Sequence, residues 1–231
     1  MWGDPDTAIG GNRDRFPSTQ VSLIASAAGD PVAMERVVEL YWKPVYKFVR
    51  FKYRKDNEAA KDLTQGFFAS VLEREFFEHF DPAKAGFRTY IRLAVERFAA
   101  KQHEAANRQK RGGGVEFVEL ETASASSESP EEIFLQEWRR QLFALAIDDL
   151  RKEYQSAGKL REWDIFEAYD LAQGERPTYA VLAQRHGFAE TSVTNYLASA
   201  RRRLRALVTD RLRGVTSGER ELREEMRRLW N

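Results

Sequence analysis

Helical periodicity is clearest between Asn57 and Arg74, and it constrains the fold more than any other feature of the sequence. On a helical wheel the apolar residues of this stretch share one side with a single threonine: Ala60, Leu63, Thr64, Phe67, Phe68, Val71 and Leu72. The opposite side includes Gly66, and a glycine inside a helix costs about 0.5–1 kcal/mol relative to alanine. We therefore predict an amphipathic helix whose outer side is packed closely by a partner. The alternative is a solvated helix with one unfavourable residue.

The same period recurs along most of the chain and predicts an all-α protein. A chain of 231 residues can bury one large core or two small ones. A change of composition favours two small helical domains, because residues 115–130 are acidic and serine-rich without a helical period, as in a flexible linker. The predicted parts are a disordered N-terminal tail (1–17), a first helical domain (18–114), the linker (115–130), a helix-turn-helix domain (131–214) and a charged C-terminal helix (215–231).

Capping residues and prolines set the expected helix ends in the first domain. Ser18 or Thr19 can begin a short helix that ends at Ala28. Asp30 and Pro31 then restart the chain as a cap and a first helical residue. The further helices that we expect here cover Val32–Trp42, Pro44–Arg54, Asn57–Arg74 and a long stretch from Phe87 to about Arg111.

The helix that begins at Phe87 carries basic residues along both edges of its apolar stripe. The stripe comprises Phe87, Tyr90, Ile91, Ala94, Val95, Phe98 and Ala105; one edge has Arg88, Arg92 and Lys110, and the other has Arg97, Lys101 and Arg108. The total charge is uninformative, because charged residues make up 32% of the chain yet leave a net charge of only +1. Such rows of cations form either a solvated face or a surface for phosphates.

A helix-turn-helix pattern spans Thr178 to Leu204. Ala183 is small where two helices must cross, and Gly187 supplies the turn. Val193 and Leu197 recur on the inner side of the second helix. An ordinary helical hairpin is the alternative. In a major groove the second helix would read bases through uncharged side chains, while its arginines bind phosphates. The candidate contacts are Glu190, Thr191, Ser192, Thr194, Asn195, Ser199, Arg201, Arg202, Arg203 and Arg205.

Several classes of protein are not expected. The sequence has no cysteine, hence no disulfide and no thiolate metal site, and it has no run of about 18 apolar residues and no apolar signal segment near its start. We expect a cytoplasmic protein without a membrane span, a metal, a cofactor or a small-molecule substrate. The spacing of Arg74 and His79 is found in helical ribonucleases of the HEPN type, but this fit is weak and no enzyme is expected.

These segments together resemble a bacterial RNA polymerase sigma factor of the small extracytoplasmic-function (ECF) type, in the sigma-70 family. Residues 37–54 are similar to the first core-binding helices of that family. Residues 62–65, Asp-Leu-Thr-Gln, resemble its D-L-V-Q signature, and Phe80-Asp81-Pro82 with Gly86-Phe87-Arg88-Thr89-Tyr90 resembles its F-D-P and F-R-x-W motifs. The helix-turn-helix is similar to the domain that reads the minus-thirty-five promoter element. The resemblance covers roughly residues 33–112 and 131–212.

The resemblance implies that core RNA polymerase and promoter DNA are the partners, and that the chain directs promoter recognition and melting without catalysis of its own. The polymerase contacts would be Asp62, Gln65, Gly66 and Ala69. The contacts with the melted minus-ten strand would be Arg88, Tyr90, Arg92, Arg97, Lys101, Arg108, Lys110 and Arg111. The acidic linker would run through polymerase channels that otherwise hold nucleic acid.

The sequence departs from the family pattern at contact positions. Ala59, Lys61 and Gly66 replace the usual acids around Asp62, so docking on a basic polymerase surface would lose attraction. In some relatives a Ser/Thr kinase supplies this charge, and Thr64 is the corresponding hydroxyl, although it lies in the apolar stripe. An anti-sigma protein or the C-terminal extension are other possible regulators. The remaining alternative for the whole chain is a helix-turn-helix regulator that binds DNA without polymerase.

Overall fold

The computed structural model describes residues 31–71, 75–110 and 128–230, and every regular element in these ranges is helical, which confirms the all-α prediction. The elements are α2 (Pro31–Lys52), α3 (Asn57–Val71), α4 (Glu75–Glu78), α5 (Phe87–Lys110), α6 (Pro130–Ser156), α7 (Leu160–Phe166), the short π-helix η1 (Glu167–Leu171), α8 (Tyr179–His186), α9 (Glu190–Arg213) and α10 (Glu219–Trp230). The predicted tail, the Ser18–Ala28 helix and nearly all of the linker lie outside the described residues.

Helix α2 is continuous, whereas we expected two helices separated near Pro44. A proline inside a helix removes one backbone hydrogen bond and disfavours the helical conformation of its predecessor. Packing outweighs this cost here, because the helix is buried on both sides of the proline: Leu40 and Tyr41 are buried before it, and Val45 and Phe48 after it. The helical stripe therefore runs through Pro44 without a break.

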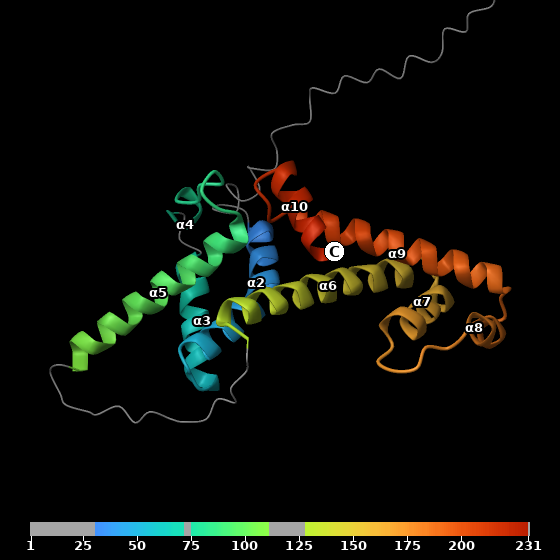
Figure 1. Ribbon diagram of the computed structural model, residues 1–231, viewed down its shortest axis with the longest axis horizontal. Helices are drawn as coiled ribbons and strands as arrows, with labels where there is room; N and C mark the ends of the chain where they lie inside the picture. The colour runs from blue at the N-terminus through green and yellow to red at the C-terminus, as the bar shows by residue number, and fades with distance from the viewer. Residues whose placement is uncertain (1–30, 72–74, 111–127, 231) are drawn as a thin grey trace, which may run out of the picture.

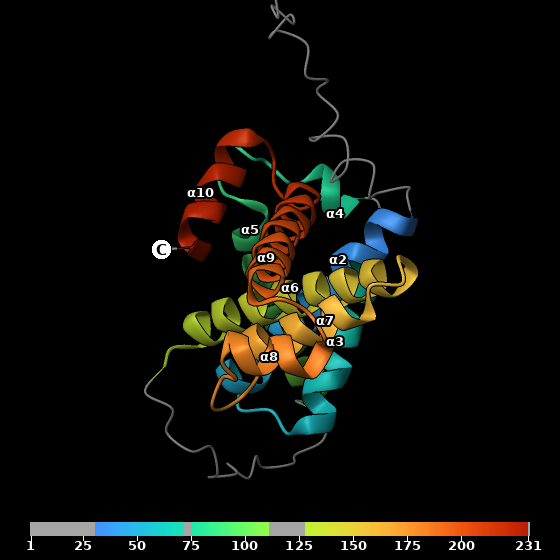
Figure 2. The same cartoon turned by 90° about the vertical axis from the view of Figure 1, so that its right-hand side faces the viewer.

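Helix α6 is the centre of the molecule (Figures 1 and 2). Ser129 caps it in a reciprocal capping box with Glu132, and Pro130 occupies its first turn. Its fully inward residues recur at helical spacing: Phe134, Trp138, Leu142, Ala146 and Leu150. This stripe meets α2 along one part, where the rings of Phe48 and Phe134 lie 5.8 Å apart, and α9 along another.

The helices before and after the predicted linker share one hydrophobic core. Gln141 of α6 donates a hydrogen bond to the carbonyl of Glu39 in α2 at 2.9 Å. Arg211 of α9 bridges Asp149 of α6 at 2.6 Å and Glu39 at 3.8 Å. In this structure the two parts that we predicted as domains therefore pack directly on each other rather than standing apart.

The glycine of α3 does not face outward as predicted. A Cβ atom on Gly66 would lie 3.3 Å from the ring of Phe98 in α5, so the missing side chain lets these two helices approach closely. The apolar stripe that we predicted for α3 is confirmed within the described residues, since Ala60, Phe67 and Val71 are buried. The close packing that the glycine indicated is thus within the chain itself.

Helices α8 and α9 are joined by the predicted turn at Gly187. Thr178 accepts a hydrogen bond from the backbone of Val181 and caps α8, and Gly187 ends it in the left-handed region at φ 71°. Ala183, Val193 and Leu197 are buried as expected. The helix that precedes this pair, α7, begins at Leu160 and continues into the π-helix η1, which ends at Leu171.

Candidate nucleic-acid interface

Helix α3 presents an exposed row and hides the residue that a kinase would need. Asp62, Gln65 and Ala69 are exposed. Thr64 is completely buried, and its hydroxyl donates a hydrogen bond to the carbonyl of Ala60 at 2.7 Å. A kinase cannot reach this hydroxyl while α3 keeps its packing. The row therefore offers one carboxylate, one amide and one methyl group for a partner.

One basic edge of α5 is turned toward the rest of the protein. Arg88 pairs with Glu225 of α10 at 2.7 Å, and its guanidinium lies 4.6 Å from the ring centre of Trp138. Arg92 pairs with Glu96 at 2.5 Å and with Glu131 at 3.6 Å. The sequence predicted both arginines as contacts with the melted minus-ten strand, and in this structure both are held by carboxylates of the chain.

The other edge of α5 is open. Arg97 and Lys101 are exposed, and the last part of α5 extends away from the other helices (Figure 1). Ala105, which we placed in the apolar stripe, is exposed for the same reason, because the core ends near Ala99. The side chains of Arg108 and Lys110, and all of Arg111, lie outside the described residues.

Tyr90 belongs to an aromatic cluster as well as to the surface. Its ring packs 5.1 Å from Phe76 and 5.2 Å from Phe80, and its hydroxyl donates a hydrogen bond to the carbonyl of Phe76 at 2.6 Å. Burial raises the pKa of this hydroxyl. The residue is half-buried, so part of it stays exposed to solvent.

The first half of α9 carries an exposed polar row. Glu190, Thr191, Thr194, Asn195 and Ser199 are exposed, whereas Ser192 is half-buried. The hydroxyl of Thr194 donates to the backbone carbonyl of Glu190 at 3.1 Å. This is the row expected on the reading side of a helix-turn-helix, and its side chains are short and uncharged apart from Glu190.

The arginines of α9 do not form one free cluster. Arg201 makes two hydrogen bonds to Asp170, both 2.8 Å long, and Arg203 binds both carboxylate oxygens of Glu153. The hydrogen bonds from Arg203 hold the pKa of Glu153 below its usual range. Arg205 lies 5.2 Å from the ring centre of Trp230. Arg202 is exposed on the outer side of the helix, in line with Asn195.

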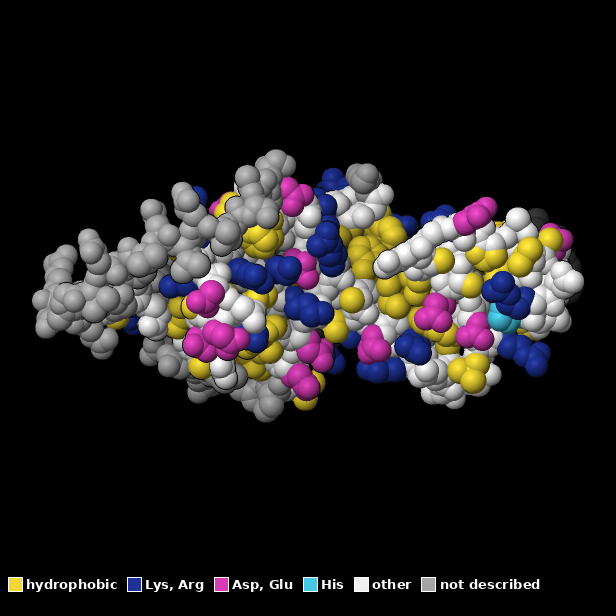
Figure 3. Space-filling model, turned by 90° about the horizontal axis from the view of Figure 1, so that it is seen from below, with side chains coloured by type: hydrophobic (Ala, Val, Ile, Leu, Met, Phe, Trp, Pro, Cys, Tyr) yellow, Lys and Arg dark blue, Asp and Glu magenta, His cyan; other side chains and the backbone are white. Residues whose placement is uncertain are grey.

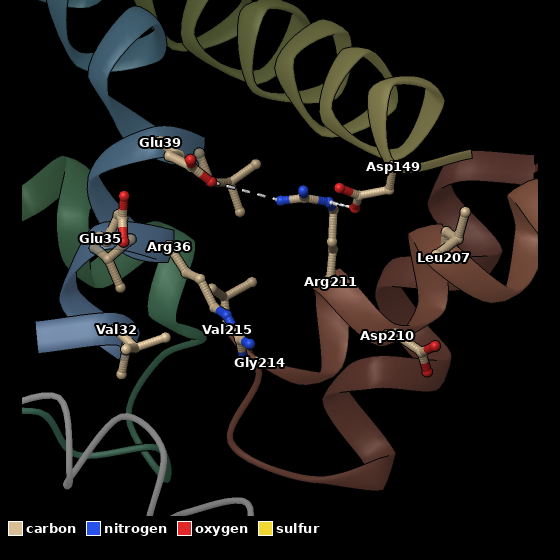
Figure 4. Close-up of a pocket in the computed structure, with 13 residues that line it drawn as sticks. Val32, Glu35, Arg36, Glu39, Asp149, Leu207, Asp210, Arg211, Gly214 and Val215 are labelled. Atoms are coloured by element: carbon tan, nitrogen blue, oxygen red, sulfur yellow. Dashed lines mark hydrogen bonds and ion pairs between the residues drawn. The ribbon is translucent and has the colours of Figure 1, made fainter. Parts of the chain in front are cut away.

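Charge alone does not mark an interface. Lysine and arginine side chains are interspersed with aspartate and glutamate over the face shown in Figure 3. A cavity of about 420 Å³ between α2, α6 and the end of α9 is likewise mixed, with acidic and basic side chains on its wall. Arg211 crosses it between Glu39 and Asp149 (Figure 4). This cavity is lined by three helices. Among the described residues, no group of three or more acids and histidines could hold a metal ion.

Comparison with protein families fits the helices described above. The model of one family, described as ECF sigma factor, matches residues 19–157, which is more than half of the chain. The chain belongs to the ECF sigma factor family. The match contains α2, α3 and α5 and ends at the close of α6, so the helix-turn-helix lies beyond it. Comparisons with curated proteins and with solved structures give no match.

Membership of the ECF family gives the general activity. An ECF sigma factor acts with RNA polymerase and binds DNA in promoter-specific transcription initiation, and this is not a class of enzyme. No helix among the described residues is long and apolar enough to cross a membrane. Arg74 of the possible ribonuclease pair lies outside the described residues, so the structure does not place that pair.

Sequence reasoning missed the acidic partners of the basic residues. Glu225, Asp170 and Glu153 lie far along the chain from the arginines that they bind. Helical periodicity shows which side of a helix a residue occupies, but it does not show which other helix lies opposite. The one available signal was the charged composition predicted for residues 215–231, which include Glu225.

Proposed function

We propose that this ECF sigma factor docks on core RNA polymerase through the exposed row of α3 and contacts promoter DNA through two surfaces. The first surface is the start and open edge of α5, with Tyr90, Arg97 and Lys101 for the melted minus-ten strand. The second is the exposed row of α9 for the minus-thirty-five element. The observation that carries the proposal is the exposure of Asp62 and Gln65 beside a fully buried Thr64.

The double substitution Asp62→Arg with Gln65→Arg tests the docking surface. It places two cations toward a basic polymerase surface, so we expect binding of core polymerase to weaken about tenfold or more. Run-off transcription with core polymerase and a genomic promoter library should lose its promoter-dependent products in parallel. Co-purification with core polymerase gives the binding directly.

A matched control is available on α6. Asp148→Arg with Gln155→Arg makes the same two replacements at exposed helical positions away from α3 and should leave both readouts unchanged. If the unsubstituted chain neither binds core polymerase nor yields promoter-dependent transcripts, the proposed function is wrong. Stable binding of duplex DNA by the chain alone, with no polymerase contact, is instead what the regulator alternative predicts.

Two neighbouring arginines of α9 test the second DNA surface. Arg202→Ala should weaken binding to every duplex sequence and lower the slope of log affinity against log salt by about one, because one phosphate contact is lost. Arg203→Ala should change that slope less, since Glu153 already holds the Arg203 guanidinium. The measurement is a salt titration of holoenzyme binding to duplex DNA. Equal slope changes for the two variants would contradict this assignment of α9.

A further inference from the structure

The last helix, α10, closes over the first turn of α5 (Figures 1 and 2). One carboxylate oxygen of Glu221 accepts a hydrogen bond from the backbone N–H of Phe87 at 3.1 Å. Its other oxygen accepts from the N–H and the hydroxyl of Ser217, both at 2.7 Å. One turn later, Glu225 accepts from Arg88 at 2.7 Å and from Arg228 at 3.1 Å. The N–H of Phe87 and the guanidinium of Arg88, at the start of α5, are thus bound by acids of α10.

The contact is closely fitted. A Cβ atom on Gly86 would lie only 2.2 Å from the nearer carboxylate oxygen of Glu221, so this carboxylate would have to shift if the glycine were replaced. Glu225 is only 6% exposed although it is an acid. Leu222 is buried between these two acids along the helix, and at the far end the ring of Trp230 packs 5.4 Å from that of Phe143. Both polar and apolar groups therefore hold α10 in place.

The covered groups are those that a nucleic-acid strand would use. A helix start offers free N–H groups and a positive dipole end, and an arginine beside it adds a full charge, so phosphates and carboxylates compete for the same donors. If Glu225 leaves, Arg88 loses the carboxylate that it binds at 2.7 Å. A phosphate in its place would restore the pairing. Exchange of one anion for another is therefore the favourable way to open this contact.

We propose that α10 is an autoinhibitory clasp, in which Glu221 and Glu225 occupy the start of α5 and must leave before the minus-ten strand of promoter DNA can bind there. This inference rests on the proposed function, since that function assigns the start of α5 to the melted strand. Promoter binding then depends on an event that displaces α10. Binding of the chain to core polymerase is one such event.

The test compares two double variants of the full chain. Glu221→Gln with Glu225→Gln removes the charges that face α5, while Glu219→Gln with Glu224→Gln removes the same number of charges from α10 outside this contact. Binding of a fluorescent single-stranded DNA pool of random sequence is measured by anisotropy. If the clasp is closed about nine-tenths of the time, the first variant should bind about tenfold more tightly than the unsubstituted chain. The control variant should bind as the unsubstituted chain does.

A substitution on the other side of the contact gives a second measurement. Gly86→Ala displaces the Glu221 carboxylate without changing any charge, so it should also tighten DNA binding, and in the Glu221→Gln background it should add little. This variant decides the matter if the double glutamine variant does not fold. The clasp is overturned if folded variants bind DNA like the unsubstituted chain, or if the control tightens binding equally, since that would be an effect of net charge.

Co-purification with core polymerase, measured on the same proteins, keeps the two proposals apart. If core polymerase binds and promoter-dependent transcripts form while the glutamine variants change nothing, only the clasp fails. If core polymerase never binds, the proposed function fails, whatever the DNA measurement gives.

Discussion

Replacing Trp138 with alanine is expected to lower the free energy of unfolding by about 3–5 kcal/mol, the usual cost of a large aromatic truncation in a well-packed core. The indole is only 1% exposed and belongs to the buried stripe of α6. Because α6 packs against both α2 and α9, the resulting cavity would lie where the helices before and after the linker meet, and neither side can collapse into it alone. Urea denaturation followed by circular dichroism measures the loss.

The same change should also loosen α10. The guanidinium of Arg88 lies over the indole and reaches Glu225 from there, so removing the ring removes the support of that ion pair. A matched control for the loss of unfolding free energy is Trp230→Ala, which deletes the same side chain where it is 40% exposed and mainly loses its ring contact with Phe143, worth about 0.5–1.5 kcal/mol. If the two alanine variants lost equal free energy of unfolding, Trp138 would not be the core residue that we describe.

The all-α fold could be predicted from the sequence because helical periodicity records burial within each helix. The buried Ala183, Val193 and Leu197, and the glycine that ends α8, follow from spacing and capping alone. Pro44 shows the limit of such rules: its local preference predicted a break, and burial of the residues on both sides outweighed it. Local preference is a weak guide when a helix packs along its whole length.

The candidate site was less predictable, because function there depends on which helices meet. Gly66 was correctly identified as a position of close approach, but the approaching group is Phe98 and not another protein. Arg88 was correctly placed on the edge of α5, yet the acid opposite it comes from the end of the chain. Such long-range pairs leave no periodic trace in the sequence. Only the three-dimensional packing separates the held arginines from the exposed Arg202.

Introducing a carboxylate at Thr64 is expected to lower the free energy of unfolding by about 3–5 kcal/mol, the range for an uncompensated charge in a core. The threonine side chain is fully buried, so the charge of Thr64→Glu could not reach water while α3 stays packed. The glutamine of Thr64→Gln has nearly the same shape as the glutamate of Thr64→Glu but carries no charge. The difference in the free energy of unfolding between these two variants therefore isolates the electrostatic cost. Thr64→Val removes only a hydroxyl that bonds a helix carbonyl, and we expect a loss of about 1 kcal/mol or less.

The pH dependence of that difference tests whether the carboxylate is buried. Burial raises the pKa of a carboxyl group above its unfolded value of about 4.3, so the folded state binds the proton more tightly than the unfolded state. Stability then falls as the pH rises above that unfolded value, and the gap between Thr64→Glu and Thr64→Gln should be widest near neutral pH and should close toward about pH 4. A constant gap would mean that the side chain has turned to solvent.

These measurements also decide between two views of the residue. If Thr64 is a structural part of α3, the glutamate variant should lose stability and polymerase binding together, because the row formed by Asp62, Gln65 and Ala69 depends on the packing of the helix beneath it. If phosphorylation instead supplies the acids that this sequence lacks, the glutamate variant should stay as stable as the glutamine variant and bind core polymerase more tightly. The complete burial of the hydroxyl favours the first outcome.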